Sequence, residues 1–102
     1  MAGITTHVLD TAQGRPAANV RLTLTRDDQM LFEGATDSDG RARLLDHAEP
    51  GTYRLTFDTG AYNPGGFFPS ATIEFRIDEP AQQHYHVPLL LSPFGYATYR
   101  GS

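Results

Sequence analysis

Three histidines are the residues of this sequence best suited to chemistry near neutral pH. His84 and His86 lie two positions apart in residues 84–91, which read as a β-strand. Alternate residues of a strand share a face, so we expect these two imidazoles on one side of a sheet. His7 lies in another predicted strand, on the face that it shares with Thr5 and Leu9. General acid–base catalysis is one interpretation, because the histidine pKa lies near neutrality; ordinary hydrogen-bonded positions in a sheet are another.

A zinc site is a third interpretation of the same histidines. Two ligands at positions i and i+2 plus one remote ligand form a workable zinc geometry. No cysteine is present, and no aspartate or glutamate recurs near these histidines at ligand spacing. Because the sequence does not say whether His7 reaches the pair, metal binding stays an alternative at this point.

Other candidate groups bear on the type of reaction. Arg41 and Arg43 are two apart on a predicted strand, and a guanidinium can hold a carbonyl oxygen or an oxyanion; a solvated edge position is the alternative. Ser92 lacks the Gly-x-Ser-x-Gly context of a nucleophilic serine. If the protein is an enzyme, we therefore expect water to be the attacking group.

Residues 37–40 read Asp-Ser-Asp-Gly, which resembles half of a calcium-binding loop. A complete loop would need a third oxygen ligand before Gly40 and a glutamate where Ala48 stands. We therefore predict a hairpin turn in which Gly40 takes the positive φ.

Short alternating segments separated by turns fill the chain. Eight strands are predicted, at residues 4–10, 20–25, 30–36, 41–45, 52–58, 72–77, 84–91 and 96–100. Residues 60–66 cannot form a long helix, because they contain Gly60, Pro64, Gly65 and Gly66. Strands spaced in this way, with little or no helix, predict an all-β sandwich.

Length and composition limit the remaining possibilities. The 102 residues, 39% hydrophobic and with a net charge of −4, predict one domain over residues 1–102. The mild acidity argues against nucleic acid or an anionic membrane as partner. The longest apolar run, residues 87–91, is too short to cross a bilayer. Without cysteines or a signal-peptide pattern, we expect a cytoplasmic protein.

Segments spread over the whole chain resemble one known family. In the first two thirds these segments are Thr5-Thr6-His7-Val8-Leu9-Asp10, Gly14-x-Pro16-Ala17, Thr36-Asp37-Ser38-Asp39-Gly40-Arg41, Gly51-Thr52-Tyr53-Arg54 and Phe67-Phe68-Pro69. The more specific ones are His84-Tyr85-His86-Val87-Pro88-Leu89-Leu90-Leu91-Ser92-Pro93 and the terminal Tyr99-Arg100-Gly101-Ser102. Together they resemble the 5-hydroxyisourate hydrolases, the transthyretin-related enzymes of urate breakdown. The terminal tetrapeptide is the feature that separates these hydrolases from the hormone carrier transthyretin.

The resemblance implies a fold, an assembly and a reaction. The expected fold is a transthyretin-like (prealbumin-like) sandwich of two four-stranded sheets, and the expected assembly is a homotetramer with active sites where dimers meet. The expected reaction is hydrolysis of 5-hydroxyisourate to 2-oxo-4-hydroxy-4-carboxy-5-ureidoimidazoline, a cyclic amide hydrolysis that needs no metal or organic cofactor. A transthyretin-like module that binds a small ligand without turnover is the alternative.

The resemblance also assigns residues by position. It implies His7, Arg41, His86 and Ser102 as catalytic residues. It implies Tyr99, Arg100 and Gly101 as substrate-binding residues, whereas His84 matches the signature without a clear role. We expect His7 or His86 to take a proton from water, Arg41 to stabilise the developing oxyanion, and Ser102 to orient a histidine or the substrate. The family's short helix before residue 72 is doubtful here, because residues 61–66 are compressed and contain helix breakers.

Overall fold

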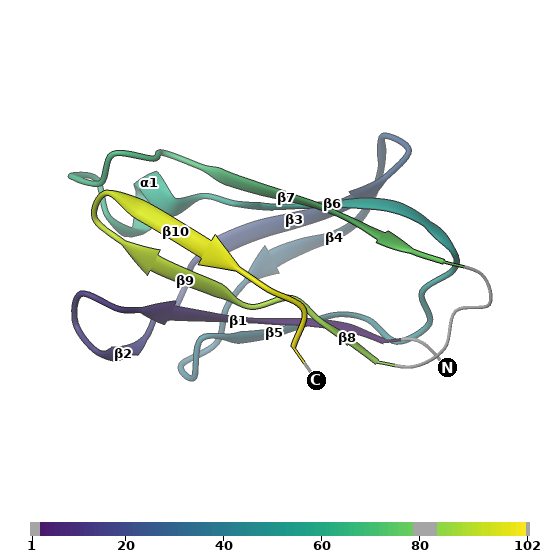
Figure 1. Cartoon of the computed structure of the whole chain (residues 1–102), viewed down its shortest axis with the longest axis horizontal. Helices are drawn as coiled ribbons and strands as arrows, with labels where there is room; N and C mark the ends of the chain where they lie inside the picture. The colour runs from purple at the N-terminus through teal and green to yellow at the C-terminus, as the bar shows by residue number, and fades with distance from the viewer. Residues whose placement is uncertain (1–2, 79–83, 102) are drawn as a thin grey trace.

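The computed structural model describes residues 3–78 and 84–101, and it shows two β-sheets packed face to face (Figure 1). The first sheet has six strands, which are β1 (Ile4–Asp10), β2 (Arg15–Pro16), β5 (Arg41–Leu45), β8 (Tyr85–His86), β9 (Leu89–Ser92) and β10 (Gly95–Thr98). The second has four, in the order β4 (Gln29–Ala35), β3 (Arg21–Arg26), β6 (Gly51–Phe57) and β7 (Ala71–Ile77). The predicted transthyretin-like all-β sandwich is confirmed.

The two inner faces form the hydrophobic core, as the alternation predicted. Tyr53, Leu55 and Phe57 of β6 are fully buried, and they belong to the same cluster as Ile4 and Val8 of β1. Along β1 buried and half-buried residues alternate strictly, so Thr5, His7 and Leu9 lie on the outer face. Apolar contacts therefore fix which side of β1 carries its histidine.

The first sheet differs from the predicted four strands because β1 has more partners than a local pattern reveals. The predicted strand at 84–91 is divided at Val87 and Pro88 into β8 and β9, since proline has no N–H for a ladder. Both pieces run parallel to β1, β8 beside Ile4 and Thr5 and β9 beside residues 8–10. β2, which was not among the predicted strands, pairs with Leu9 and Asp10. The final strand ends at Thr98, two residues earlier than predicted.

A short helix, α1 (Thr59–Tyr62), lies at one end of the sandwich (Figure 1). The doubt about this helix was therefore wrong, although no long helix forms in this region. The Asp58 carboxylate accepts a hydrogen bond from the backbone N–H of Ala61 at 3.1 Å and caps the helix. The Tyr62 hydroxyl donates to the Asp10 carboxylate at 2.7 Å, which ties the helix to β1. Within the described residues no helix has the length and apolar character needed to cross a membrane.

Candidate active site

The predicted site residues of the first two thirds of the chain meet on the outer face of the six-stranded sheet. β1 and β5 are antiparallel, and their register places His7 opposite Arg41 and Thr5 opposite Arg43. Directly opposed residues of an antiparallel pair share a face. The inward side of β1 is held by Thr6, whose buried hydroxyl donates to the Val87 carbonyl at 2.6 Å.

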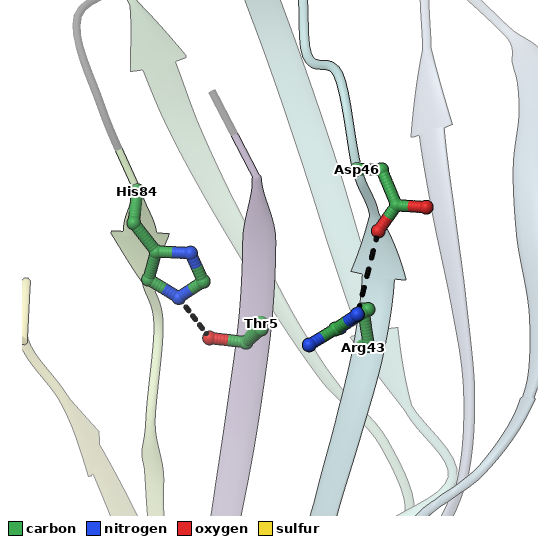
Figure 2. A network of polar contacts seen from close by, with 4 residues as sticks. All are labelled: Thr5, Arg43, Asp46 and His84. Atoms are coloured by element: carbon green, nitrogen blue, oxygen red, sulfur yellow. Dashed lines mark hydrogen bonds and ion pairs between the residues drawn. The ribbon is translucent and has the colours of Figure 1, made fainter. Parts of the chain in front are cut away.

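The histidines of the C-terminal region reach the same face through β8. In the parallel pairing of β1 and β8, Thr5 is the partner of His86. The Thr5 Oγ1 lies 2.7 Å from His84 Nε2 and 2.9 Å from His86 Nδ1. Figure 2 shows the His84 ring turned toward Thr5, with Arg43 and Asp46 on the other side of β1. One hydroxyl therefore joins two imidazoles that lie about 80 residues from it in sequence.

The turn before β5 holds both His7 and Arg41. Gly40 has a φ of +76°, and the Asp37 carboxylate accepts hydrogen bonds from the backbone N–H groups of Asp39 and Arg41, both at 2.9 Å. The predicted turn and the positive φ of Gly40 are confirmed, but the predicted hairpin was wrong, because β4 and β5 lie in different sheets and the turn connects them. Chiefly because the Arg41 N–H donates to it, the pKa of the Asp37 carboxyl lies below its ordinary value.

The same turn determines which nitrogen of His7 can accept a proton. His7 Nε2 lies 2.9 Å from the Asp39 carbonyl oxygen. A carbonyl only accepts hydrogen bonds, so Nε2 must carry the hydrogen. In neutral His7 the available lone pair is therefore on Nδ1.

The C-terminal segment passes directly over His86. The Gly101 N–H donates to the His86 carbonyl at 2.8 Å, and the two residues form an isolated antiparallel bridge. A Cβ on Gly101 would lie 2.6 Å from Cδ2 of the His86 ring. Only glycine allows the chain to pass this close to the imidazole.

A cavity of about 560 Å³ lies beside these residues, although His7 and Gly101 are not part of its lining. Its lining consists of Thr5, Thr6, Asp37, Arg41, Ala42, Arg43, His84 and His86. The pKa of His86 lies below its ordinary 6.5. Burial of the ring is the largest cause, and the nearby charges of His7, His84 and Arg41 add to it. The ion pairs of residues 3–78 and 84–101 do not involve Arg41, whereas Arg43 lies 3.8 Å from Asp46. The cavity therefore combines a mostly neutral imidazole with a guanidinium that forms no ion pair within the described residues.

Two of the predicted substrate-binding residues lie elsewhere. Tyr99 and Arg100 line a separate groove of about 240 Å³ between the edges of the two sheets, together with Phe75 of β7. The Arg100 guanidinium carbon lies 4.8 Å from the centroid of the Tyr85 ring, a cation–π contact. Of the terminal tetrapeptide, Gly101 contacts His86, and Ser102 lies outside the described residues.

The arrangement also bears on metal binding. In the part of the chain that the structure describes, histidine, cysteine, aspartate and glutamate form no group of three that could hold a metal ion. His7 Nε2 is already hydrogen-bonded to a backbone carbonyl, and the Thr5 hydroxyl contacts one nitrogen of His84 and one of His86. The geometry supports proton transfer better than ligation.

Sequence reasoning missed two groups of this site, the Thr5 hydroxyl and the Asp39 carbonyl. Thr5 was expected on the face of His7, yet its contact with His84 and His86 depends on a register that only the folded chain reveals. A threonine two residues before a candidate base on the same strand face was the one available signal.

Comparison with known proteins shows the family to which the chain belongs. Residues 4–101 match the HIUase/Transthyretin family. A 5-hydroxyisourate hydrolase of Caulobacter vibrioides is 44% identical, with all of both chains covered. The uric acid degradation bifunctional protein TTL of Arabidopsis thaliana is 45% identical over 97% of this chain, which spans only 37% of that protein. The structure of Klebsiella pneumoniae 5-hydroxyisourate hydrolase covers 100% of both chains with a TM-score of 0.91 and 36% identity. The chain belongs to the HIUase/Transthyretin family.

Proposed function

We propose that this protein is a hydrolase that opens the six-membered ring of 5-hydroxyisourate. The relatives named 5-hydroxyisourate hydrolase support the substrate. The observation that carries the proposal is the meeting of His7, Arg41 and His86 on one sheet face, beside a cavity of about 560 Å³. A neutral base can activate water, and a guanidinium without an ion pair in the described residues can stabilise the oxyanion, so the two groups suit hydrolysis of an amide.

His86 is the proposed general base. Its lowered pKa keeps the imidazole neutral near pH 7, so the ring has a lone pair available. Its Nδ1 is occupied by Thr5, which leaves Nε2 for the attacking water. His7 has its free lone pair on Nδ1 and acts as a second proton acceptor or as a contact to the substrate.

Arg41 is the proposed oxyanion-stabilising residue. Water oxygen bonds to the ring amide carbonyl carbon while His86 Nε2 takes one water proton, and negative charge collects on the carbonyl oxygen. The Arg41 guanidinium stabilises that charge, because its donors are not used by an ion pair in the described residues. The carbon–nitrogen bond then breaks, the ring nitrogen receives the proton from His86, and the product carries a new carboxyl group.

The C-terminal tetrapeptide is the proposed substrate-binding segment. Gly101 already contacts the base, and Ser102 follows it in sequence as the proposed catalytic residue of the segment. Arg100 is one residue before Gly101 and Tyr99 is two residues before it, so we propose that they complete the substrate site from the neighbouring groove. A tag fused after Ser102 should reduce kcat/KM without changing the melting temperature, and full activity with the tag would contradict the role proposed for Ser102.

The test of the proposed function follows the decay of freshly made 5-hydroxyisourate in an ultraviolet spectrometer. The native chain should accelerate decay above the spontaneous rate, and deletion of residues 99–102 should remove most of that acceleration. His86→Asn should lower kcat by about a hundredfold or more. If the native protein binds the compound but leaves its decay at the spontaneous rate, the chain is a ligand-binding module and the proposal is wrong.

We further propose that the protein is a homotetramer located in the cytoplasm. Large aromatic side chains remain exposed on the single chain: Phe67 is 69% and Phe94 is 79% accessible. Exposed apolar surface of this kind commonly marks an association site. Light scattering after gel filtration should give a molar mass of about four times 11.2 kDa. The mass of a monomer would refute the tetramer. Cell fractionation tests the location.

A further inference from the structure

We propose that Thr5 and His84 are positioning residues that determine which ring nitrogen of His86 carries its proton. The inference rests on the proposed function only in its consequence for the rate. Its structural basis is the chain of contacts from His84 Nε2 through Thr5 Oγ1 to His86 Nδ1, at 2.7 and 2.9 Å.

A hydroxyl between two imidazoles restricts their protonation. Threonine has one hydrogen to donate and lone pairs to accept, so it can donate to only one of the two rings. The other ring must then donate its own N–H to Thr5. With both rings neutral and the Thr5 hydrogen directed at one of them, two arrangements satisfy every group in the chain of contacts.

In the first arrangement Thr5 donates to His84 Nε2 and accepts the Nδ1–H of His86. The Nε2 lone pair of His86 is then free, as the proposed base requires. In the second arrangement His84 Nε2–H donates to Thr5, which donates to His86 Nδ1. Neutral His86 then has its proton on Nε2 and cannot accept one from water.

The protonation of His84 selects between these arrangements. A protonated His84 has a hydrogen on Nε2, so it must donate to Thr5 and imposes the second arrangement. His84 is exposed to solvent. Its ring lies beside Gly3, where an added Cβ would be 3.2 Å from His84 Nδ1.

The surroundings of His86 leave Thr5 as the partner of its Nδ1. His7 and Arg41 act on His86 through their charge from β1 and β5, and His84 does so from its own segment. Gly101 approaches the Cδ2 side of the ring, away from Nδ1. Arg43 and Asp46 lie beyond Thr5 and pair with each other (Figure 2).

Three variants of the full-length protein test the coupling. Thr5→Val keeps the shape and strand preference of threonine but removes the hydroxyl, Thr5→Ser keeps the hydroxyl, and His84→Leu removes the outer ring. Thr56→Val is the matched control, because it removes one threonine hydroxyl, bonded to Thr72 at 3.0 Å, from the other sheet. Melting temperatures establish that each variant folds.

Long-range ¹H–¹⁵N spectra of ¹⁵N-histidine-labelled protein report the tautomer directly. In the native protein at a pH where His84 is neutral, His86 should carry its proton on Nδ1, and protonation of His84 should move the neutral tautomer toward Nε2–H. Thr5→Val should remove this dependence, and Thr5→Ser should retain it. A His86 tautomer that is the same in native protein and Thr5→Val at every pH would overturn the proposal.

The rates provide a second readout. Thr5→Val and His84→Leu should lower kcat about tenfold or more while KM changes little, as expected when a partner that orients a functional imidazole is removed. Thr5→Ser and Thr56→Val should stay near the native rate. Native kcat in Thr5→Val would refute the positioning role. If the native protein shows no turnover, the proposed function fails, and the spectra still decide the coupling.

Discussion

Replacing Gly101 by alanine should damage the site while leaving the sandwich intact. The added Cβ would lie 2.6 Å from Cδ2 and 3.2 Å from both Cβ and Cγ of His86. Carbon atoms in good contact are about 3.5 Å apart or more, so the ring or the C-terminal segment must move by about 1 Å. These three atoms all belong to the side chain of one residue, the proposed base, so the displacement falls on the catalytic geometry.

A misplacement of about 1 Å can cost on the order of a hundredfold in rate, which corresponds to about 2.7 kcal/mol of transition-state stabilisation. We expect kcat for 5-hydroxyisourate to fall by about that factor in Gly101→Ala, measured under saturating substrate against the spontaneous decay. The melting temperature should change little, because Gly101 makes one bridge at the end of the chain.

Gly95→Ala is the matched control for this experiment. A Cβ on Gly95 would meet only the Ser92 hydroxyl, at an ordinary 3.6 Å, so activity should stay near native. Native kcat in Gly101→Ala would refute the argument that this glycine is required for the position of His86. An equal loss in Gly95→Ala would show that any alanine in the C-terminal region is harmful, and would refute it as well.

Three further predictions concern stability. Folding lowers the pKa of His86 below its ordinary 6.5, so between the folded and unfolded pKa values the unfolded chain binds more protons, and the free energy of unfolding should fall as the pH falls through that window. In His86→Asn the free energy of unfolding, measured by urea titration, should depend less steeply on pH. An identical dependence would contradict the assignment. Tyr62→Phe removes the hydrogen bond to Asp10 and should cost about 1 kcal/mol in urea unfolding, whereas unchanged stability would show that the bond contributes nothing. Gly40→Ala should lower the melting temperature much more than Gly14→Ala. The added Cβ at position 40 would lie 2.5 Å from the Val8 carbonyl oxygen, whereas position 14 has a similar positive φ and no atom within 4 Å of an added Cβ. Equal effects would assign the cost to backbone conformation alone.

Most of the fold could be predicted from local patterns, because burial repeats with the period of each strand. The alternation in β1 and β6 identified their inward residues, and the Asp-Ser-Asp-Gly turn was recognised from residues that favour turns. The division of residues 84–91 was not predicted, although Pro88 was visible. The Val87 N–H still donates to Thr5 of β1, and the pairing with β1 resumes at Leu89. How far a proline interrupts a strand therefore depends on neighbours that only the folded chain reveals.

The helix shows a similar limit. Glycine and proline in residues 60–66 argued correctly against a long helix, but four residues need only a cap and a place to pack. Asp58 supplies the cap, and Gly60 allows close approach to Pro69, whose carbonyl oxygen would lie 3.0 Å from an added Cβ. Pro69 follows Gly60 by nine residues, so the sequence of the helix itself does not reveal this contact.

For the site, sequence identified the chemical groups but not how they are connected. His7, Arg41 and His86 were named from residue type and family resemblance, and their roles stay predictions until the variants are measured. The link through Thr5 requires the register between the first and the eighth strand, separated by about 80 residues. No periodic pattern within either strand contains that information.

The parallel pairing of β1 with β8 and β9 also determines when the site can exist during synthesis. His7 leaves the ribosome early, and its sheet neighbours in β8 and β9 are made at the end of the chain. At about 5–20 residues per second, roughly 4 to 16 s separate the translation of His7 from that of His86. During this interval one edge of β1 has no strand beside it, while β5 can already cover the other. A ribosome stalled before residue 84 should therefore display a nascent chain that is prone to associate through this edge and has no hydrolase activity.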